Sequence, residues 1–220
     1  MAIPSFVNAG AKAAGAAAVT PALPAGILAN DILLLIAESN TNEAVTVPTP
    51  NGGTWTQVTN SPQNASATRL TVFWSRYNGT QGAPTTNDPG DHICCQILAF
   101  RGCVASGDPW NITSGGIENT SDTSASITGA TTTAVDCRVV AICCTGADSN
   151  SAQFSAWANA GLGSVAELTG ADICTNAGAG GGVAAASGTK AIAGAYGATT
   201  ATLATASTKG FMTIALRPPP

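Results

Sequence analysis

The chain has 220 residues, with 8 Lys and Arg against 12 Asp and Glu and a single His, so its formal net charge is −4. Charged residues make up 9% of the chain, against roughly 25% in an ordinary soluble domain. A negative chain without a Lys/Arg cluster argues against nucleic-acid binding. The lack of Leu/Glu/Lys-rich heptads excludes a coiled coil or helical bundle, and apolar runs combined with low charge exclude a disordered chain.

Short apolar or alternating runs, separated by Gly, Asn, Pro, Asp and Ser clusters, predict an all-β fold. The predicted strands cover residues 3–7, 14–20, 31–38, 44–47, 54–58, 69–77, 92–101, 124–128, 137–145, 164–168, 182–186, 199–204 and 210–216. Their spacing favours one domain over residues 1–220, a jelly-roll-like sandwich of two β-sheets with Greek-key connections and long loops. Residues 1–24 are predicted to form an extended arm or an edge strand, and residues 218–220 a proline tail.

Three kinds of strand pattern predict different degrees of burial. Residues 32–37 and 139–144 are apolar on both faces, as expected for central strands covered on both sides. In residues 69–77, Leu70, Val72 and Trp74 share one face while most of the other face is polar, which predicts a half-buried strand. The Gly/Ala tract 177–186 has few side chains to bury and is predicted to be a loop that enters an edge strand.

The two halves of the chain resemble each other. Asp31 opens an apolar strand, Trp55 follows after a loop, and a later strand ends at Arg101. Asp136, Trp157 and Arg217 repeat this order in the second half. The repetition indicates pseudo-symmetry within a two-sheet sandwich.

No segment is predicted to cross a membrane. The most apolar run, residues 32–37, lies between Asp31 and Glu38 and is far shorter than the span of about 20 residues that a bilayer requires. The Ala-rich stretch 9–19 has no basic region before it and contains Lys12. We therefore expect no signal peptide, and synthesis in the cytoplasm.

The cysteines are read mainly as core residues. The seven are Cys94, Cys95, Cys103, Cys137, Cys143, Cys144 and Cys174. Two adjacent pairs lie in strand-like runs, where neighbours face opposite sides, so one member of each pair should point into the core as a small hydrophobe. A disulfide is the alternative if the protein ends up outside a cell.

The sequence offers no set of catalytic or metal-binding residues. His92 and Cys94 share one face of a strand, which supplies two metal ligands but not three. Asp31, Asp91 and Asp136 each precede an apolar strand, where the capping of a turn is their expected role. No Gly-x-Ser-x-Gly elbow or phosphate-binding loop is present. We therefore expect no catalytic residue, no cofactor, no metal and no enzymatic activity.

The tryptophans are the candidate contact residues. Trp55, Trp110 and Trp157 lie near predicted loops, where aromatic side chains can stack on a sugar or a partner. Trp74 lies on the apolar face of its strand and is assigned to the core.

Five stretches resemble recurring motifs of tailed-bacteriophage virion proteins with jelly-roll-like β-sandwich folds. They are ANDILLL at 29–35, GTW at 53–55, LTVFWSR at 70–76, ILAFRG at 97–102 and MTIALRP at 212–218. The resemblance spans most of the chain and implies a capsid decoration or cement protein, a head fibre or a tail-associated protein. It supplies no catalytic residue, and the cysteine content departs from it.

These observations together predict a non-enzymatic protein on the virion surface, most simply a capsid decoration or cement protein that binds and stabilises the shell. Its low charge and small polar side chains suit a homo-oligomer, with a trimer matching capsid symmetry. The expected partners are further copies of the chain and the major capsid or tail protein, with no nucleic acid and no membrane. The alternative is a tail or fibre module that binds host-surface glycan through the loop tryptophans. A polysaccharide depolymerase is disfavoured because acids and histidine are scarce.

Overall fold

The computed structural model describes residues 2–168 and 172–220, and every helix or strand in this part is a β-strand. The strands are β1 (Ser5–Ala9), β2 (Ala13–Gly15), β3 (Ile32–Ser39), β4 (Thr56–Gln57), β5 (Gln63–Asn64), β6 (Arg69–Arg76), β7 (Ile93–Arg101), β8 (Trp110–Ile127), β9 (Thr131–Thr132), β10 (Cys137–Thr145), β11 (Phe154–Ala158), β12 (Gly163–Glu167), β13 (Ile173–Thr175), β14 (Gly181–Lys190), β15 (Gly194–Ala195) and β16 (Thr199–Leu216).

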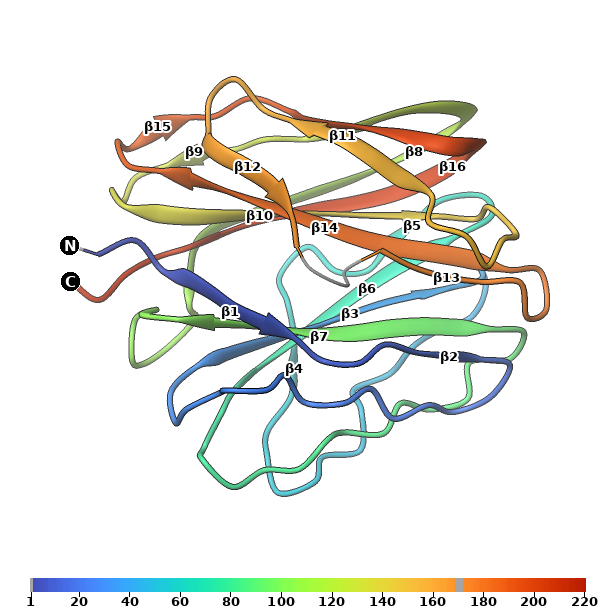
Figure 1. The fold of residues 1–220 in the computed structure, drawn as a ribbon, viewed down its shortest axis with the longest axis horizontal. Coiled ribbons are helices and arrows are strands. Elements are labelled where there is room, and N and C mark those ends of the chain that lie inside the picture. Colours follow the sequence, from blue (N-terminus) through green and yellow to red (C-terminus); the bar gives the residue numbers. More distant parts are fainter. Residues whose placement is uncertain (1, 169–171) are drawn as a thin grey trace.

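Two antiparallel sheets of seven strands each pack against one another, and β9 pairs with β15 in a small separate sheet. Figure 1 shows the two layers: the lower is coloured blue to green and the upper yellow-green to red. The lower layer therefore comes from the first half of the chain and the upper from the second. The prediction of an all-β, two-sheet sandwich is confirmed.

Both sheets have the same order of long strands. In the first sheet β3 lies between β7 and β6, and in the second β10 lies between β16 and β14. The connection from β6 to β7 therefore crosses over β3, and that from β14 to β16 crosses over β10. The repetition seen in the sequence has this origin, because Asp31 and Asp136 directly precede the two central strands.

The main core lies between the layers. Alternate residues of the long strands point inward, since neighbouring side chains of a strand face opposite sides. The inward residues include Ile32, Leu34, Ile36, Val72, Leu98, Val140, Ile142, Val183, Met212 and Ile214. The other faces of β3 and β10 are also buried, so the prediction for residues 32–37 and 139–144 is confirmed.

The prediction that residues 69–77 form a half-buried strand is wrong. Thr71, Phe73 and Ser75, on the side away from the main core, are 1%, 0% and 2% exposed. Phe73 packs in a second apolar cluster with Val45 and Trp55, which come from the loop after β3. This loop covers the outer face of the first sheet, and a single strand pattern cannot reveal such a cover.

The prediction for the Gly/Ala tract is also corrected. β14 lies inside the second sheet, with β10 on one side and β12 and β13 on the other. Its small residues permit close approach: a Cβ added at Gly182 would lie 2.6 Å from Cys174 Sγ. The lack of side chains therefore marks a tightly packed strand rather than an edge.

β8 and β16, both of 18 residues, form a long ribbon in the upper layer. The two strands predicted at 199–204 and 210–216 are parts of the single strand β16. Residues 110–123 of β8 were not predicted as a strand, because their Thr, Ser, Gly and Asn residues give no alternation of apolar and polar side chains. The pairing of the two strands is interrupted by shifts of register, two of which flank Ser207.

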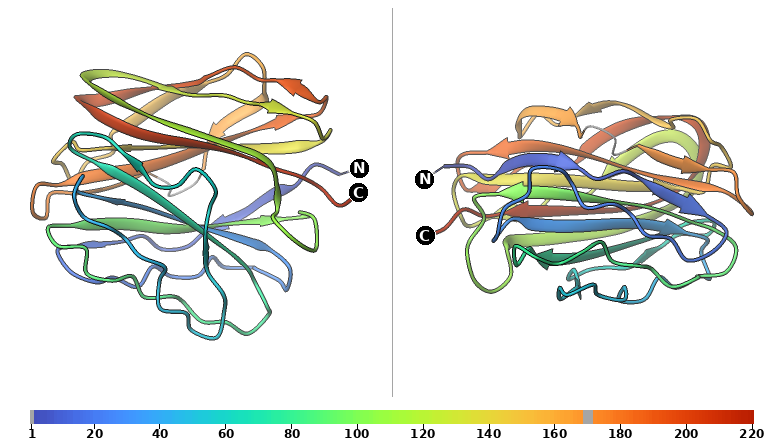
Figure 2. Two further views of the ribbon diagram at one scale, coloured as in Figure 1. Left: turned by 180° about the vertical axis from the view of Figure 1, so that it is seen from behind. Right: turned by 60° about the horizontal axis from the view of Figure 1, so that its bottom comes forward.

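The N-terminal segment forms one edge of the first sheet. β1 and β2 both pair with β7, and Val19 and Leu23 pack on the outer face of that sheet. Of the two alternatives for residues 1–24, the edge strand is therefore what the described residues form, and residue 1 lies outside them. In both views of Figure 2 the two chain ends lie together. We call this the terminal end; β3 and β10 begin there, and the distal end is opposite.

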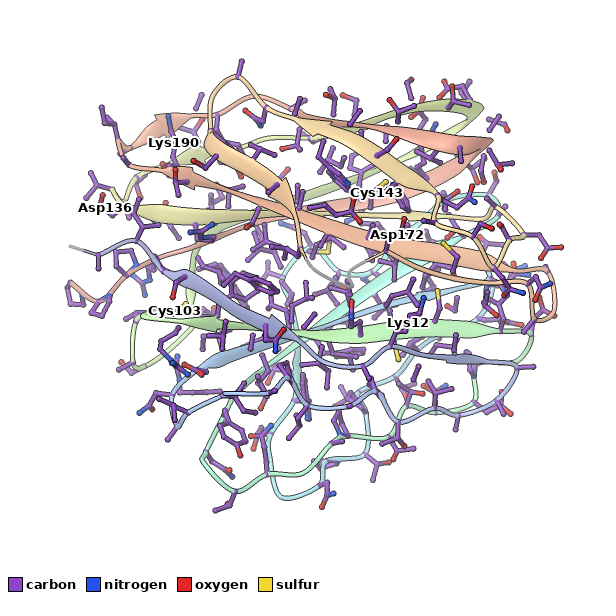
Figure 3. The ribbon with its side chains drawn as sticks, in the orientation of Figure 1. Lys12, Cys103, Asp136, Cys143, Asp172 and Lys190 are labelled. Carbon is purple, nitrogen blue, oxygen red and sulfur yellow. The ribbon has the colours of Figure 1, made fainter. Side chains whose placement is uncertain are left out.

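All seven cysteines are free and buried. Cys94 and Cys144 belong to the core between the sheets, whereas their neighbours Cys95 and Cys143 belong to clusters on the outer faces. The prediction for the adjacent pairs is thus confirmed. Figure 3 labels Cys143 in the upper layer and Cys103 in the lower one, near the terminal end.

Candidate functional site

The three predicted contact tryptophans do not gather in one place. Trp55 is 5% exposed and packs in the cluster on the outer face of the first sheet, so it is a core residue and not an accessible contact. Trp157, in β11, is half-buried and stacks on Phe154 with ring centroids 5.8 Å apart. Trp110, at the start of β8, meets Trp74 edge-on at 5.5 Å.

Trp74, which the sequence assigned to the core, packs against the main core but is half-buried, and it lines a hollow of about 300 Å³. We call it the β6 hollow. Its lining residues are Gly52, Gly53, Thr54, Thr56, Trp74, Arg76 and Asn78. Trp74 and Arg76 share one face of β6, because residues two apart in a strand point the same way.

Arg76 is held in a fixed position. Its Nη1 donates to the carbonyl oxygen of Val104 at 2.8 Å, and its Nη2 donates to that of Gly107 at 3.1 Å. The guanidinium carbon lies 5.9 Å from the centre of the Trp74 ring, within the range of a cation–π contact. Partial burial lowers the pKa of the Arg76 guanidinium, which nevertheless stays charged at neutral pH.

The opposite wall is held by Asn78 and Gln81. Asn78 Nδ2 donates to the carbonyl oxygen of Gly52 at 2.7 Å, and Asn78 Oδ1 accepts from the backbone N–H of Gln81 at 2.7 Å. A Cβ added at Gly53 would lie 2.7 Å from the Gln81 side-chain amide. Glycine at this position lets the loop close against Gln81.

A second polar cluster lies at the distal end, between the sheets. Glu38, the penultimate residue of β3, and His92, just before β7, have fully buried side chains. His92 Nε2 lies 3.1 Å from Glu38 Oε2, and His92 Nδ1 lies 3.3 Å from Asp91 Oδ2. Thr68 Oγ1 also donates to Glu38 Oε1, at 2.8 Å.

The charges in this cluster depend on each other. Burial raises the pKa of Glu38, although the hydrogen bond and charge of His92 oppose that rise. Burial disfavours the imidazolium of His92, but the hydrogen bonds and charges of Glu38 and Asp91 outweigh it and raise the pKa of His92 to about 8. For Asp91, a hydrogen bond from the Ala179 backbone N–H, followed by one from His92, lowers the pKa. The arrangement favours an imidazolium between two carboxylates.

Cysteine thiols border this cluster, but they are not activated. Cys94 Sγ donates to Glu38 Oε2 at 3.4 Å, and Cys144 Sγ lies 3.2 Å from Thr68 Oγ1. Burial raises the pKa of Cys144 to about 12, and burial together with the Glu38 charge raises that of Cys94 well above its usual value. A thiol of this kind is not a nucleophile at neutral pH. The cluster is therefore suited to holding the two sheets together rather than to covalent chemistry.

A third cluster surrounds Lys209 of β16, whose side chain is fully buried. Its Nζ lies 2.7 Å from Asp122 Oδ1 and 3.2 Å from Glu118 Oε2, and it donates to the carbonyl oxygen of Ser124 at 2.7 Å. The lysine lies where the pairing of β8 with β16 shifts register. It satisfies polar groups that the interrupted pairing leaves, which is a structural role.

Comparison with known proteins adds no identification. No family model, curated relative or solved structure matches the chain. Within the described residues, no group of three or more His, Cys, Asp or Glu side chains is placed to hold a metal ion. The same part of the chain contains no helix that is long and apolar enough to cross a bilayer.

Sequence reasoning missed the β6 hollow, although a signal was present. Trp74 and Arg76 alternate at the end of a strand and are followed by the Asn78–Gly79 turn. An inward side chain at the end of a strand is only partly covered by its neighbours. The period-2 pattern alone therefore overestimated the burial of Trp74. The other wall, residues 52–56, comes from the loop after β3 and the start of β4, and the sequence did not show that β4 pairs with β6.

Proposed function

We propose that this chain is a non-enzymatic structural protein of a tailed-bacteriophage virion, made in the host cytoplasm, and that it binds the capsid shell as a decoration or cement protein. The observation that carries the proposal is the terminal end of the sandwich. Both chain ends lie there (Figure 1), beside a second hollow of about 510 Å³. We call this the proline hollow; it is lined by Val104, Ser106, Thr133, Ala134, Val135, Arg217, Pro218, Pro219 and Pro220.

The proline hollow has the properties of a docking surface. Most of its lining is apolar, Val135 is 44% exposed, and Arg217 is the one charged residue in it. Exposed apolar surface on an otherwise polar protein marks contact with a partner. The proline side chains lose little conformational entropy when a partner covers them. A segment of the shell protein is the proposed occupant.

The motif resemblance supports the same role, because two of the motifs form one unit in the fold. Asp31, in the 29–35 motif, pairs with Arg101, in the 97–102 motif, in a salt bridge of 2.7 Å. Two groups that could act as acid or base, Glu38 and His92, have no exposed side-chain surface, and the seven thiols are buried. A scaffold role is the simplest reading of such a molecule.

Self-association is proposed to occur through β8. In the described part of the chain β8 pairs with β16 alone, which leaves its other edge without a strand. Residues 60–66 lie against part of this strand: Asn60 Nδ2 donates to the carbonyl oxygen of Thr113, and the Ser66 N–H donates to Asn119 Oδ1. The remainder of a long edge strand can pair with a strand of another copy. A homo-oligomer, with a trimer as the form that suits capsid symmetry, is part of the proposal.

The alternative role is a tail or fibre module that binds host glycan through loop tryptophans. Part of the argument for it is lost, because Trp55 is buried and Trp157 lies in the second sheet, apart from Trp55, which packs on the first. One observation still favours it, the β6 hollow with its Trp74 wall.

Immunogold labelling of intact phage particles that carry this chain tests the proposal directly. Gold over the whole head is the expected result. Gold confined to the tail tip would contradict the capsid role and favour the alternative, and no gold on accessible particles would overturn any role on the virion surface.

A rebinding experiment tests the docking surface. Purified chain is added to particles stripped of it, and the bound fraction is measured by sedimentation. Val135→Asp should abolish rebinding, because it places a charge in the proline hollow. Val47→Asp is the matched control: Val47 is also an exposed valine, at 54%, and it does not line the hollow. Equal rebinding of both variants would refute the proposed surface.

A further inference from the structure

We infer that the β6 hollow binds a saccharide that carries a carboxylate group, with Trp74 as its apolar wall and Arg76 as the partner of the carboxylate. This inference goes beyond the capsid role and does not depend on it. A decoration protein and a tail protein would both display such a site.

The lining has the chemical character that a sugar ring requires. A sugar presents apolar C–H patches together with hydroxyl groups, and aromatic side chains flanked by short polar groups bind both kinds of surface. Trp74 supplies the aromatic surface, and Thr54 and Thr56, both exposed, supply hydroxyls that donate and accept. The backbone of Gly52 and Gly53 adds polar groups without bulk. A volume of about 300 Å³ lies at the small end of ligand sites, the size of one or two sugar rings.

The charge of Arg76 selects an acidic sugar. Arg76 is the one ionisable residue in the lining. Its guanidinium donates to two backbone carbonyls, and no ion pair within the described residues neutralises it. Arg101 is different, because Asp31 lies 2.7 Å from it. A guanidinium without a counter-ion in a concave site attracts a carboxylate and bonds it with charge-assisted hydrogen bonds.

The site is already formed without a ligand. The bonds from Arg76 to Val104 and Gly107 fix one wall, and those of Asn78 fix the loop that carries Gly52. Trp110, edge-on to Trp74, limits the movement of that ring. Binding therefore requires little ordering of side chains, which is the main cost of binding for an open loop site.

The test is a titration of the purified 220-residue chain with a saccharide, in which binding is measured by calorimetry and by tryptophan fluorescence. The probe is a disaccharide ending in a hexuronic acid, and the comparison is the neutral hexose disaccharide of the same linkage. We expect the acidic probe to bind at least about tenfold more tightly than the neutral one, the effect of one charge-assisted hydrogen bond.

Three variants alter the hollow: Arg76→Gln, Thr56→Val and Trp74→Leu. Arg69→Gln and Trp157→Leu are the matched controls, since Arg69 is a half-buried arginine at the other end of β6 and Trp157 is a half-buried tryptophan of the other sheet. Arg76→Gln should abolish the preference for the acidic probe, and Trp74→Leu should weaken binding of both probes. Thr56→Val changes an exposed residue, so it keeps the test valid if Trp74→Leu unfolds the chain. It should weaken binding about tenfold.

Three results would overturn the inference: no binding of the acidic probe at millimolar concentration, equal binding of the acidic and neutral probes, or binding that the control variants reduce as much as the hollow variants. None of these results bears on shell binding, since no capsid is present in the titration. Failure of the saccharide site can thus be distinguished from failure of the capsid role.

Discussion

Arg101 and Asp31 are joined by two parallel hydrogen bonds, from Nε to Oδ1 at 2.9 Å and from Nη2 to Oδ2 at 2.7 Å. The Asp31 side chain is 3% exposed, and its Oδ2 also accepts from the backbone N–H of Leu28. One carboxylate thus shapes the turn before β3 and fixes the end of β7. The pair joins two stretches that the sequence could only describe as separate motifs.

Loss of either partner should therefore destabilise the chain. Asp31→Asn and Arg101→Gln are each expected to lower the urea midpoint of unfolding. The double variant should unfold close to the Asp31→Asn midpoint, because the second change removes a bond already lost. Urea titration of the four proteins measures this. Additive shifts would show that the two residues act independently.

The buried imidazolium predicts that stability falls as the pH rises past neutrality. The pKa of His92 in the folded chain is about 8, above the value near 6.5 of an unfolded histidine. Its contribution is therefore fully present below pH 6.5 and is lost as the pH rises through about 8. Stability should decrease by about 1–2 kcal/mol across this window.

Urea unfolding at pH 6.0, 7.0 and 8.0 measures the decrease. His92 is the only histidine, so His92→Gln should remove the slope between pH 6.0 and 7.0. Part of the slope between pH 7.0 and 8.0 should remain, because the buried thiols stay protonated in the folded chain while those of the unfolded chain begin to ionise. A slope that persists in the variant between pH 6.0 and 7.0 would assign the effect to another group.

The thiols should be inert in the folded chain. All seven cysteines are buried, and burial raises the pKa of Cys95, Cys103 and Cys174 to about 12. The chain is first reduced and desalted, and a thiol reagent is then added at pH 8. The reagent should label the native chain slowly, whereas all seven cysteines should be labelled after denaturation. Rapid labelling of any cysteine in the native chain would contradict its buried position.

Gly181 is expected to tolerate no side chain. A Cβ at this position would lie 2.3 Å from Glu38 Oε1, so Gly181→Ala must displace the carboxylate that holds His92. We expect a loss of about 2–3 kcal/mol. Gly15→Ala is the control, because the nearest atom to its Cβ is Val19 Cγ1 at 3.8 Å. Its effect should stay within about 0.5 kcal/mol. Similar unfolding midpoints for the two variants would refute the packing argument.

The sequence by itself determined the class of fold and the central strands. β3 and β10 are apolar on both faces, and a strand of that kind is stable only when both faces are covered. The adjacent cysteines were placed correctly for a related reason, because the period of two residues assigns neighbours to opposite sides of a sheet. These features depend on local chemistry alone, so a local pattern was sufficient to predict them.

The tertiary structure alone decided what covers each sheet and which distant residues meet. The loop with Val45 and Trp55 lies over Phe73 and turns a half-polar strand into a buried one. The β6 hollow needs residues 52–56 beside Trp74 and Arg76, and the distal cluster needs Glu38 beside His92. Such contacts join positions separated by tens of residues, and their energies depend on the packing of two sheets against each other. No local pattern contains that information, so the candidate site became visible only in the folded chain.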